Sequence, residues 1–247
     1  MSWMHFEQMA AEYASARPPY PASVYRALTD IGVIGAGTRV LEIGAGTGLA
    51  TREVLEAGSA VVALEPGPEL ARLLREAVPQ ASVVVARLEE ADLPVGSFDS
   101  VIAATSMHWV DLSMGLPKLH ATLRPDGLLA VWRNVFGDDS IETPFRRRVD
   151  QIVAQRTSAA APRPPGRPSL DELTEGGWFD PVDSQRWRWS SDLTTDQVRR
   201  LFQTFSDWTS AEVDAAAEAV DDLGGRVTEH YQTLLHVLRR TSTPAGR

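Results

Sequence analysis

A glycine-rich stretch near residue 45 constrains the fold of this chain more than any other feature of its sequence. Residues 40–51 read VLEIGAGTGLAT; a short β-branched run precedes the glycines, and a helical pattern over residues 49–57 follows them. Glycines at a strand-to-helix turn let the backbone approach a ligand closely, and the N-terminus of the helix offers unpaired N–H groups. The pattern therefore favours a ligand-binding turn over a turn with a purely structural role.

The spacing of these glycines argues against a nicotinamide dinucleotide site. The fingerprint of that site is G-x-G-x-x-G, which requires glycine at position 49, where this chain has Leu49. The spacing here is G-x-G-x-G, with glycine at Gly44, Gly46 and Gly48, and the acidic Glu42 precedes it on the strand. A nicotinamide oxidoreductase is therefore only a third hypothesis about the function.

Short apolar runs alternate with helical patterns through the first 134 residues. This alternation is typical of a parallel sheet covered by helices. Five strands are predicted, over residues 38–43, 60–65, 81–86, 100–104 and 127–134. The sequence thus predicts an α/β fold.

The pattern changes after residue 134. A helix is predicted over residues 142–155, strand-like alternation over 184–190, and a closing strand over 233–238, while residues 161–168 are too rich in proline for regular structure. Three capping boxes mark further helix starts: Ser169 with Glu172, Thr194 with Gln197, and Thr209 with Glu212. We expect a lid inserted after the fifth strand.

Composition excludes several classes of protein. The 247-residue chain has no cysteine, which excludes disulfides, a thiol nucleophile and cysteine-bound zinc, and its five histidines lack the spacing of a metal site. A net charge of −9 argues against a nucleic-acid partner, which needs a broad basic surface. No apolar run reaches the roughly 18 residues of a membrane span, and the first residues lack a signal-peptide pattern. We expect a cytoplasmic protein without a metal, membrane or nucleic-acid partner.

Three further stretches, together with VLEIGAGTG, carry a family resemblance. They are YASARPPYP (residues 13–21), SFD (97–99) and ATSMHW (104–109). Through residue 134 the chain resembles the class I S-adenosylmethionine-dependent methyltransferases, and within them the trans-aconitate methyltransferase-like branch, which acts on small molecules.

The resemblance implies a Rossmann-like seven-stranded methyltransferase sandwich in a single domain over residues 1–247. Its parts would be a cofactor-binding half (1–134), a helical lid insertion (135–183), and closing strands with substrate-side helices (184–247). Residues 137–177 are expected to be mobile and to close over the methyl acceptor, because the segment is proline-rich and follows the fifth strand.

The resemblance also implies which residues bind the cofactor, S-adenosyl-L-methionine. Gly44, Gly46 and Gly48 would surround its methionine part, and Glu42 would help to hold the ammonium group. Glu65 would accept hydrogen bonds from both ribose hydroxyls, because a carboxylate can accept two such bonds. The other implied cofactor contacts are Tyr13, Arg17, Tyr20, Pro66, Leu88, Glu89, Ala104 and Thr105.

His108 is the candidate catalytic residue. An imidazole titrates near neutral pH and can accept a proton, although a packed wall of the pocket is the alternative role. Methyl transfer to a carboxylate needs no base, since the sulfonium is already a good leaving group, so alignment and desolvation would then carry the reaction. Trp109 and Trp132 are expected to bind the acceptor as parts of an apolar pocket.

The favoured function is methyl transfer to an oxygen or nitrogen of a small-molecule acceptor, by a monomer or a homodimer. A natural-product C-methyltransferase or a peptide N-methyltransferase is the nearest alternative. A cofactor-binding partner protein without catalysis also stays open, because the glycines and Glu65 do not distinguish it from an enzyme.

Overall fold

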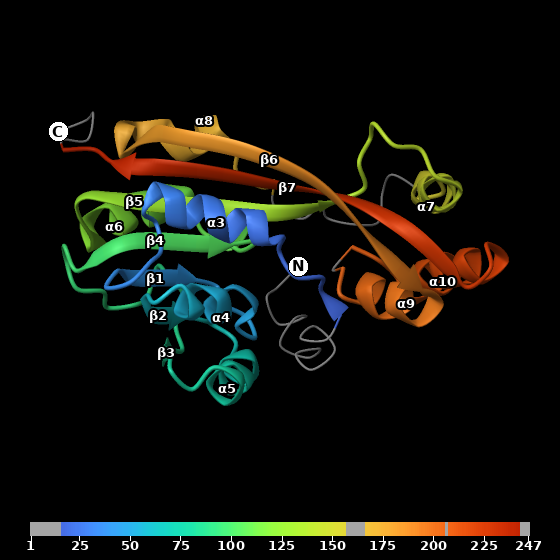
Figure 1. The fold of residues 1–247 in the computed structure, drawn as a ribbon, viewed down its shortest axis with the longest axis horizontal. Coiled ribbons are helices and arrows are strands. Elements are labelled where there is room, and N and C mark those ends of the chain that lie inside the picture. The colour runs from blue at the N-terminus through green and yellow to red at the C-terminus, as the bar shows by residue number, and fades with distance from the viewer. Residues whose placement is uncertain (1–15, 157–165, 206, 243–247) are drawn as a thin grey trace. The chain divides into compact units, whose positions relative to one another are not determined.

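The computed structural model describes residues 16–156, 166–205 and 207–242 of the chain. The strands of these residues form one seven-stranded sheet in the order β3-β2-β1-β4-β5-β7-β6 (Figure 1). They are β1 (Arg39–Ile43), β2 (Ala60–Leu64), β3 (Ser82–Val84), β4 (Phe98–Ala104), β5 (Leu123–Phe136), β6 (Phe179–Thr194) and β7 (Arg226–Arg240). The predicted α/β class and the seven-stranded sheet are confirmed.

The chain changes direction across the sheet next to β1. Strand β1 pairs in parallel with β2 on one side and with β4 on the other, and β2–β3 and β4–β5 are parallel pairs as well. Ligands of open α/β sheets bind outside the carboxyl ends of the strands at such a reversal. The fold therefore places a candidate site beyond Ile43, which ends β1, and Ala104, which ends β4.

The chain divides into two compact units, and three of the boundaries between them fall within the long strands β5, β6 and β7. The larger unit takes its residues from 20–133, 165–186 and 233–247, and the smaller unit from 1–19, 134–164 and 187–232. Helices of the larger unit are α3 (Ala22–Ile31), α4 (Leu49–Glu56), α5 (Pro68–Ala77), α6 (Leu112–Thr122) and α8 (Leu170–Thr174), with the 3-10 turns η1 (Met107–Trp109) and η2 (Glu175–Gly177). Those of the smaller unit are α7 (Pro144–Ala154), α9 (Thr195–Gln203) and α10 (Ser210–Asp222).

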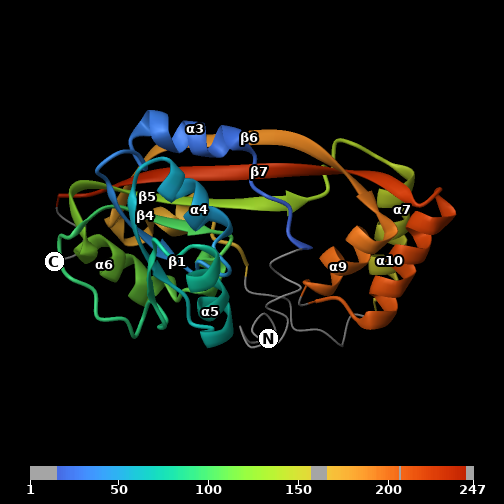
Figure 2. The same cartoon turned by 60° about the horizontal axis from the view of Figure 1, so that its bottom comes forward.

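The larger unit has a continuous apolar core. Its strands β1 and β4 bury successive residues rather than alternate ones, which is the pattern of strands covered on both faces. Figure 1 shows α4 and α5 beside β2 and β3, and Figure 2 shows the same two helices from another side; α4 contacts β2, and α5 contacts β3. The largest members of the core include Leu41, Leu64, Phe98, Met107, Leu119, Leu129, Leu173 and Phe179.

The predicted lid of residues 135–183 is divided between the two units. Phe145 and Val149 of α7 pack in the core of the smaller unit with residues of α9 and α10. Leu173 of α8, in contrast, is buried in the core of the larger unit. Residues 157–165, which include most of the proline-rich stretch, lie outside the described residues. The closing of this segment over an acceptor stays a prediction, as does the partition into three parts.

Local signals located the helix starts well, and strand ends less well. All three predicted capping boxes are present, with both reciprocal hydrogen bonds. Strands β6 and β7 are 16 and 15 residues long, far beyond the predicted alternation. Pairing with a neighbouring strand decides where a strand ends, and β6 tolerates Pro181 because it lies at the edge of the sheet. No helix in the described part of the chain has the length and apolar character needed to cross a membrane.

We expect loss of the cap of α10 to destabilise the protein measurably. The Thr209 hydroxyl accepts a hydrogen bond from the backbone N–H of Glu212, and the Glu212 carboxylate accepts one from the Thr209 N–H. Thr209→Ala should therefore lower the free energy of unfolding by about 1 kcal/mol, measured by urea unfolding. Ser190→Ala, on an exposed position of β6 in the same unit, is the control and should change it little. Equal effects of the two substitutions would contradict the capping role.

Candidate functional site

The turn between β1 and α4 holds its three glycines in left-handed backbone conformations. The φ angles of Gly44, Gly46 and Gly48 are 65°, 58° and 90°. A Cβ atom at Gly44 would lie 2.6 Å from the Cβ of Ser106, and one at Gly48 would lie 2.5 Å from Cδ1 of Leu74. At Gly46, in contrast, nothing lies within 4 Å of the Cβ position. Packing thus requires glycine at two positions, while the third faces open space that a ligand can fill.

Glu65, which follows β2, ties two backbone segments together. Its Oε2 accepts a hydrogen bond of 2.7 Å from the N–H of Gly46, and its Oε1 accepts one of 2.9 Å from the N–H of Gly67. The residue is only 4% exposed. Sequence reasoning missed this structural role. The predicted bonds to ribose hydroxyls stay compatible with it, because each carboxylate oxygen can accept a second hydrogen bond.

Glu42 lies on β1 beneath the glycine turn and is almost completely buried. Its Oε2 accepts a hydrogen bond of 2.6 Å from the hydroxyl of Thr51 in α4. Burial raises the pKa of Glu42 to about 8; the charge of Glu65 adds to the rise, and the bond from Thr51 opposes it. The carboxyl group is therefore mostly protonated at neutral pH. A cationic group placed beside it would favour the charged form.

The segment after β4 is bound to the glycine turn and to Tyr20. The Ser106 hydroxyl donates a hydrogen bond to the carbonyl oxygen of Ile43, the residue before the first glycine. Thr105 has a φ of 58°, unusual for a residue with a side chain. Its hydroxyl is 2.8 Å from that of Tyr20, whose ring meets Trp132 edge-on at 5.8 Å between centroids. The structure thus brings Tyr20 and Thr105 into contact with each other, while their expected contacts with the cofactor stay predictions.

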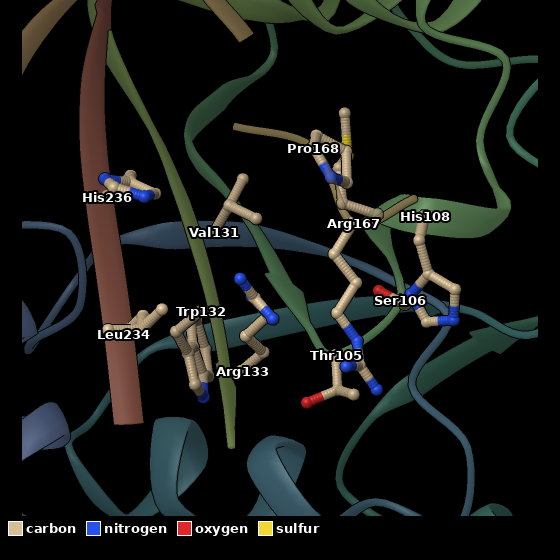
Figure 3. Close-up of a pocket in the computed structure, with 11 residues that line it drawn as sticks. Thr105, Ser106, His108, Val131, Trp132, Arg133, Arg167, Pro168, Leu234 and His236 are labelled. Atoms are coloured by element: carbon tan, nitrogen blue, oxygen red, sulfur yellow. The ribbon is translucent and has the colours of Figure 1, made fainter. Parts of the chain in front are cut away.

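A pocket adjoins this segment within the larger unit. It encloses a volume of about 330 Å³, counted with its opening to solvent. Figure 3 shows its side chains, which come from the segment after β4, from β5 and β7, and from the residues before α8. The lining residues are Thr105, Ser106, Met107, His108, Val131, Trp132, Arg133, Arg167, Pro168, Leu234 and His236.

The predicted catalytic and substrate residues take different positions around this pocket. His108 and Trp132 line it, although Trp132 is 1% exposed and belongs equally to the core. The indole N–H of Trp132 has no hydrogen-bond partner among the described residues. Trp109 lies beside the pocket rather than in its lining, with its ring centroid 4.7 Å from that of His108. Their roles toward an acceptor stay predictions.

The remaining predicted cofactor residues have mixed surroundings. Leu88 is buried in the core of the larger unit. Glu89 is occupied by its neighbours: one oxygen accepts a hydrogen bond from the N–H of Asp111, and the other lies 3.5 Å from the guanidinium of Arg87. Pro66 directly follows Glu65 and is half-buried. Because both side chains are engaged elsewhere, residues 88 and 89 would contact a ligand through their backbone groups.

Two more residues of the predicted set precede Tyr20 in the chain. Tyr13 lies outside the described residues. Arg17 donates a hydrogen bond of 3.1 Å to the carbonyl oxygen of Thr204, and its guanidinium carbon lies 4.9 Å from the ring centroid of Phe205. Its expected contact with the cofactor stays a prediction.

Arg133, Arg167 and His236 also line the pocket, which the sequence did not predict. Their positions on β5, on β7 and before α8 are far apart in the chain. A polar residue directly after a buried apolar run, such as Arg133 after Trp132, is the one local signal that could have drawn attention to this place.

Comparison with known proteins agrees with this geometry. A family model described as a methyltransferase domain matches residues 41–131, the stretch from β1 to β5 that carries the glycine turn. An uncharacterized methyltransferase of Mycobacterium tuberculosis is 28% identical over 227 residues, which cover 92% of this chain and 87% of the relative. A demethylmenaquinone methyltransferase of Tropheryma whipplei is 33% identical over 101 residues, 40% of this chain and 42% of the relative.

Solved structures share the fold. One from Anaeromyxobacter dehalogenans, named as a candidate type II methyltransferase, gives a TM-score of 0.66 at 22% identity and covers 93% of this chain and 99% of its own. The family match falls on the strands and the turn that form the site. The chain is a class I S-adenosylmethionine-dependent methyltransferase. The trans-aconitate-like branch stays a prediction.

The residues of the methyltransferase fit its cofactor, S-adenosylmethionine. Gly46 faces open space, and Gly48, the N-cap residue of α4, has no side chain to cap the N–H groups at the helix N-terminus. Glu65 supplies a carboxylate of the kind that accepts hydrogen bonds from a diol, and Glu42 supplies an acid that an ammonium group would ionise. Two buried acids beside the turn suit a ligand that carries both an ammonium group and a diol.

Replacement of Glu42 by Gln (E42Q) should remove a pH-dependent part of the stability of the methyltransferase. Because folding raises the pKa of Glu42, its contribution to stability is complete below the ordinary value of 4.5 and is lost as the pH rises through about 8. E42Q mimics the protonated form at every pH. In urea unfolding, the free energy of unfolding of E42Q should therefore rise relative to that of the wild type between about pH 5 and about pH 9.

Glu90→Gln, the same change on an exposed residue, serves as its control. The difference in unfolding free energy between that variant and the wild type should stay flat over the same range. A flat difference for E42Q as well would show that the Glu42 carboxyl is charged in the folded protein.

Replacement of Glu65 by Ala should weaken cofactor binding by at least about tenfold, because a hydrogen bond to a charged group contributes roughly 1.5–3 kcal/mol. The substitution also frees the N–H groups of Gly46 and Gly67, which loosens the turn. Calorimetric titration with S-adenosylhomocysteine measures the effect. Glu69→Ala, at an exposed position in the first turn of α5, is the matched control and should keep the affinity of the wild type. Unchanged affinity of the Glu65 variant would move the ribose contact elsewhere.

Proposed function

We propose that the protein transfers the methyl group of S-adenosylmethionine to an oxygen or nitrogen of a small molecule bound in the pocket beside Thr105–His108. One observation carries this proposal. Ser106 lines the pocket, and its hydroxyl also bonds to Ile43 at the start of the glycine turn. The pocket and the cofactor turn therefore share a wall, as two sites must when a group passes directly from one ligand to the other.

The pocket suits a small acceptor. Its lining combines apolar side chains with a few polar ones, the combination typical of small-molecule sites. Val131, Trp132 and Leu234 provide apolar wall that removes water from the acceptor, and the fixed strands β5 and β7 hold it in position. Alignment and desolvation of this kind lower the barrier of a bimolecular displacement.

The cofactor supplies an electrophilic methyl group on a sulfonium, with a thioether as leaving group. The chain then has to orient the acceptor and to accept a proton from it where one is released. His108 belongs to the segment after β4 and lines the pocket. An imidazole there can take the proton of a hydroxyl or an amine. A carboxylate acceptor has no proton to lose and would not use this group.

The names of relatives support a small acceptor without identifying it. One relative is named for demethylmenaquinone, and two structural neighbours are named for geranyl diphosphate, one of them as a C-methyltransferase. We propose oxygen or nitrogen as the methylated atom because an imidazole in the pocket lining, that of His108, can accept a proton from either. The expectations of a monomer or homodimer and of a cytoplasmic location also stay part of this proposal.

A panel of acceptors tests the proposal. Formation of S-adenosylhomocysteine, followed by mass spectrometry, should depend on a small acceptor with a free hydroxyl, amine or carboxylate. His108→Gln should lower kcat by about 100-fold or more for phenols and amines, and should change it little for carboxylates. His230→Gln, which lies outside the pocket lining, should behave as the wild type. Cofactor binding without turnover of any acceptor would favour the non-catalytic partner protein, and methylation of carbon would favour the C-methyltransferase.

A further inference from the structure

The pocket has a charge opposite to that of the chain as a whole. The chain carries a net charge of −9, yet the described residues that line the pocket include two arginines and two histidines and no acid. Arg133 belongs to the end of β5, Arg167 to the segment before α8, and His236 to β7. A concave site lined by one sign of charge concentrates ligands of the opposite sign.

Arg133 is the decisive residue of this pocket. Its side chain is half-buried, and within the described part of the chain it has neither a carboxylate partner nor a hydrogen bond. Burial lowers the pKa of Arg133, and the charge of Arg167 lowers it further. A guanidinium still stays charged at any ordinary pH. A half-buried positive charge beside a second one is unfavourable, unless a ligand supplies the missing counter-charge.

The neighbours of Arg133 fit the same interpretation. Figure 3 shows the side chains of Arg133 and Arg167 directed into the space between the β5 residues and the segment Thr105–His108. The Nδ1 atom of His236 is 2.8 Å from the hydroxyl of Ser184, which fixes the ring at the pocket wall. Burial and the charge of Arg133 lower the pKa of His236, which disfavours a third positive charge beside the two arginines.

We propose that Arg133, together with Arg167, binds an anionic carboxylate or phosphate group of the methyl acceptor. A guanidinium presents parallel N–H donors that match the oxygens of both groups, which gives orientation as well as affinity. This inference rests on the proposed function, since it places the anion in the acceptor pocket. Pairing with a guanidinium makes the bound oxygens weaker nucleophiles. We therefore assign this group to recognition and the methylation to another atom of the acceptor.

Calorimetric titration with three small probes tests the inference. Phenylacetate, phenyl phosphate and the neutral phenylacetamide are each added to protein saturated with S-adenosylhomocysteine. At least one anion should bind more tightly than the amide, and the stronger of the two distinguishes a carboxylate from a phosphate site. Arg133→Met should weaken binding of that anion by about tenfold or more and leave binding of the amide unchanged. The affinity of Arg133→Lys for the anion should lie between those of the wild type and Arg133→Met, because lysine keeps the charge but not the paired donors.

Two controls separate recognition from a structural effect. Arg239→Met removes a positive charge from an exposed position of β7 in the same unit and should leave anion binding unchanged. The melting temperature of Arg133→Met without an anion should equal or exceed that of the wild type, because the substitution removes a repulsive neighbour of Arg167. A lower melting temperature with unchanged anion binding would assign Arg133 a structural role and overturn the proposal.

The design also distinguishes this inference from the proposed function. Titration with S-adenosylhomocysteine alone comes first, and absence of binding there would contradict the proposed function. The three probes would then be titrated into the protein alone, where the comparison of Arg133→Met with the wild type still decides the inference. If neither anion binds the wild type more tightly than the amide, Arg133 is not an anion-binding residue.

Discussion

The carboxylate of Glu65 makes the contacts on which the geometry of the site most depends. Left-handed conformations at three glycines leave the turn after β1 with few internal hydrogen bonds. The turn is therefore held from outside, by the Leu64 carbonyl, which accepts from the N–H groups of Gly44 and Ala45, and by Glu65, which accepts from Gly46. A charged acceptor makes stronger hydrogen bonds than a neutral one, particularly where water is excluded. The turn is thus in place before any ligand arrives, and less ordering is needed on binding.

Two acids of similar burial near this turn have different hydrogen-bond donors. Glu65 is stabilised by two backbone N–H groups, whereas Glu42 has a single hydroxyl donor and a pKa raised to about 8. Two negative charges this close disfavour one another, so the less well solvated group keeps its proton. A ligand that brings a positive charge to Glu42 would lower the pKa of this group and favour its charged form. Affinity for an amino-acid-like ligand would then be coupled to release of a proton.

Charge is also divided between the two faces of the segment that follows β4. The buried acids lie on the side of the glycine turn, while Arg133 and Arg167 lie on the side of the pocket. Ser106 lies between them: its hydroxyl donates to the carbonyl oxygen of Ile43 before the turn, and the residue lines the pocket. This division suits a reaction between a cationic methyl donor and an acceptor with an anionic group, because each ligand is attracted to its own side.

The sequence predicted those parts of the molecule that depend on neighbours along the chain. Capping boxes at Ser169, Thr194 and Thr209 formed as predicted, because each involves residues three positions apart. The glycine turn and the alternation of strands and helices were predicted for the same reason. Helix α3 went unpredicted, and β6 and β7 proved much longer than their alternating cores, since pairing between distant segments sets the length of a strand.

Only the tertiary structure decided what surrounds the acceptor. The sequence by itself determined the glycines, the acids at residues 42 and 65, and the motif around His108. It did not show that Glu65 fastens the turn, nor that Arg133, Arg167 and His236 share one pocket. These residues come from three segments separated by at least 34 positions, and nothing in their local sequence relates them. Burial and pairing of the long strands bring their charges together, and the free energy of that arrangement belongs to the whole fold.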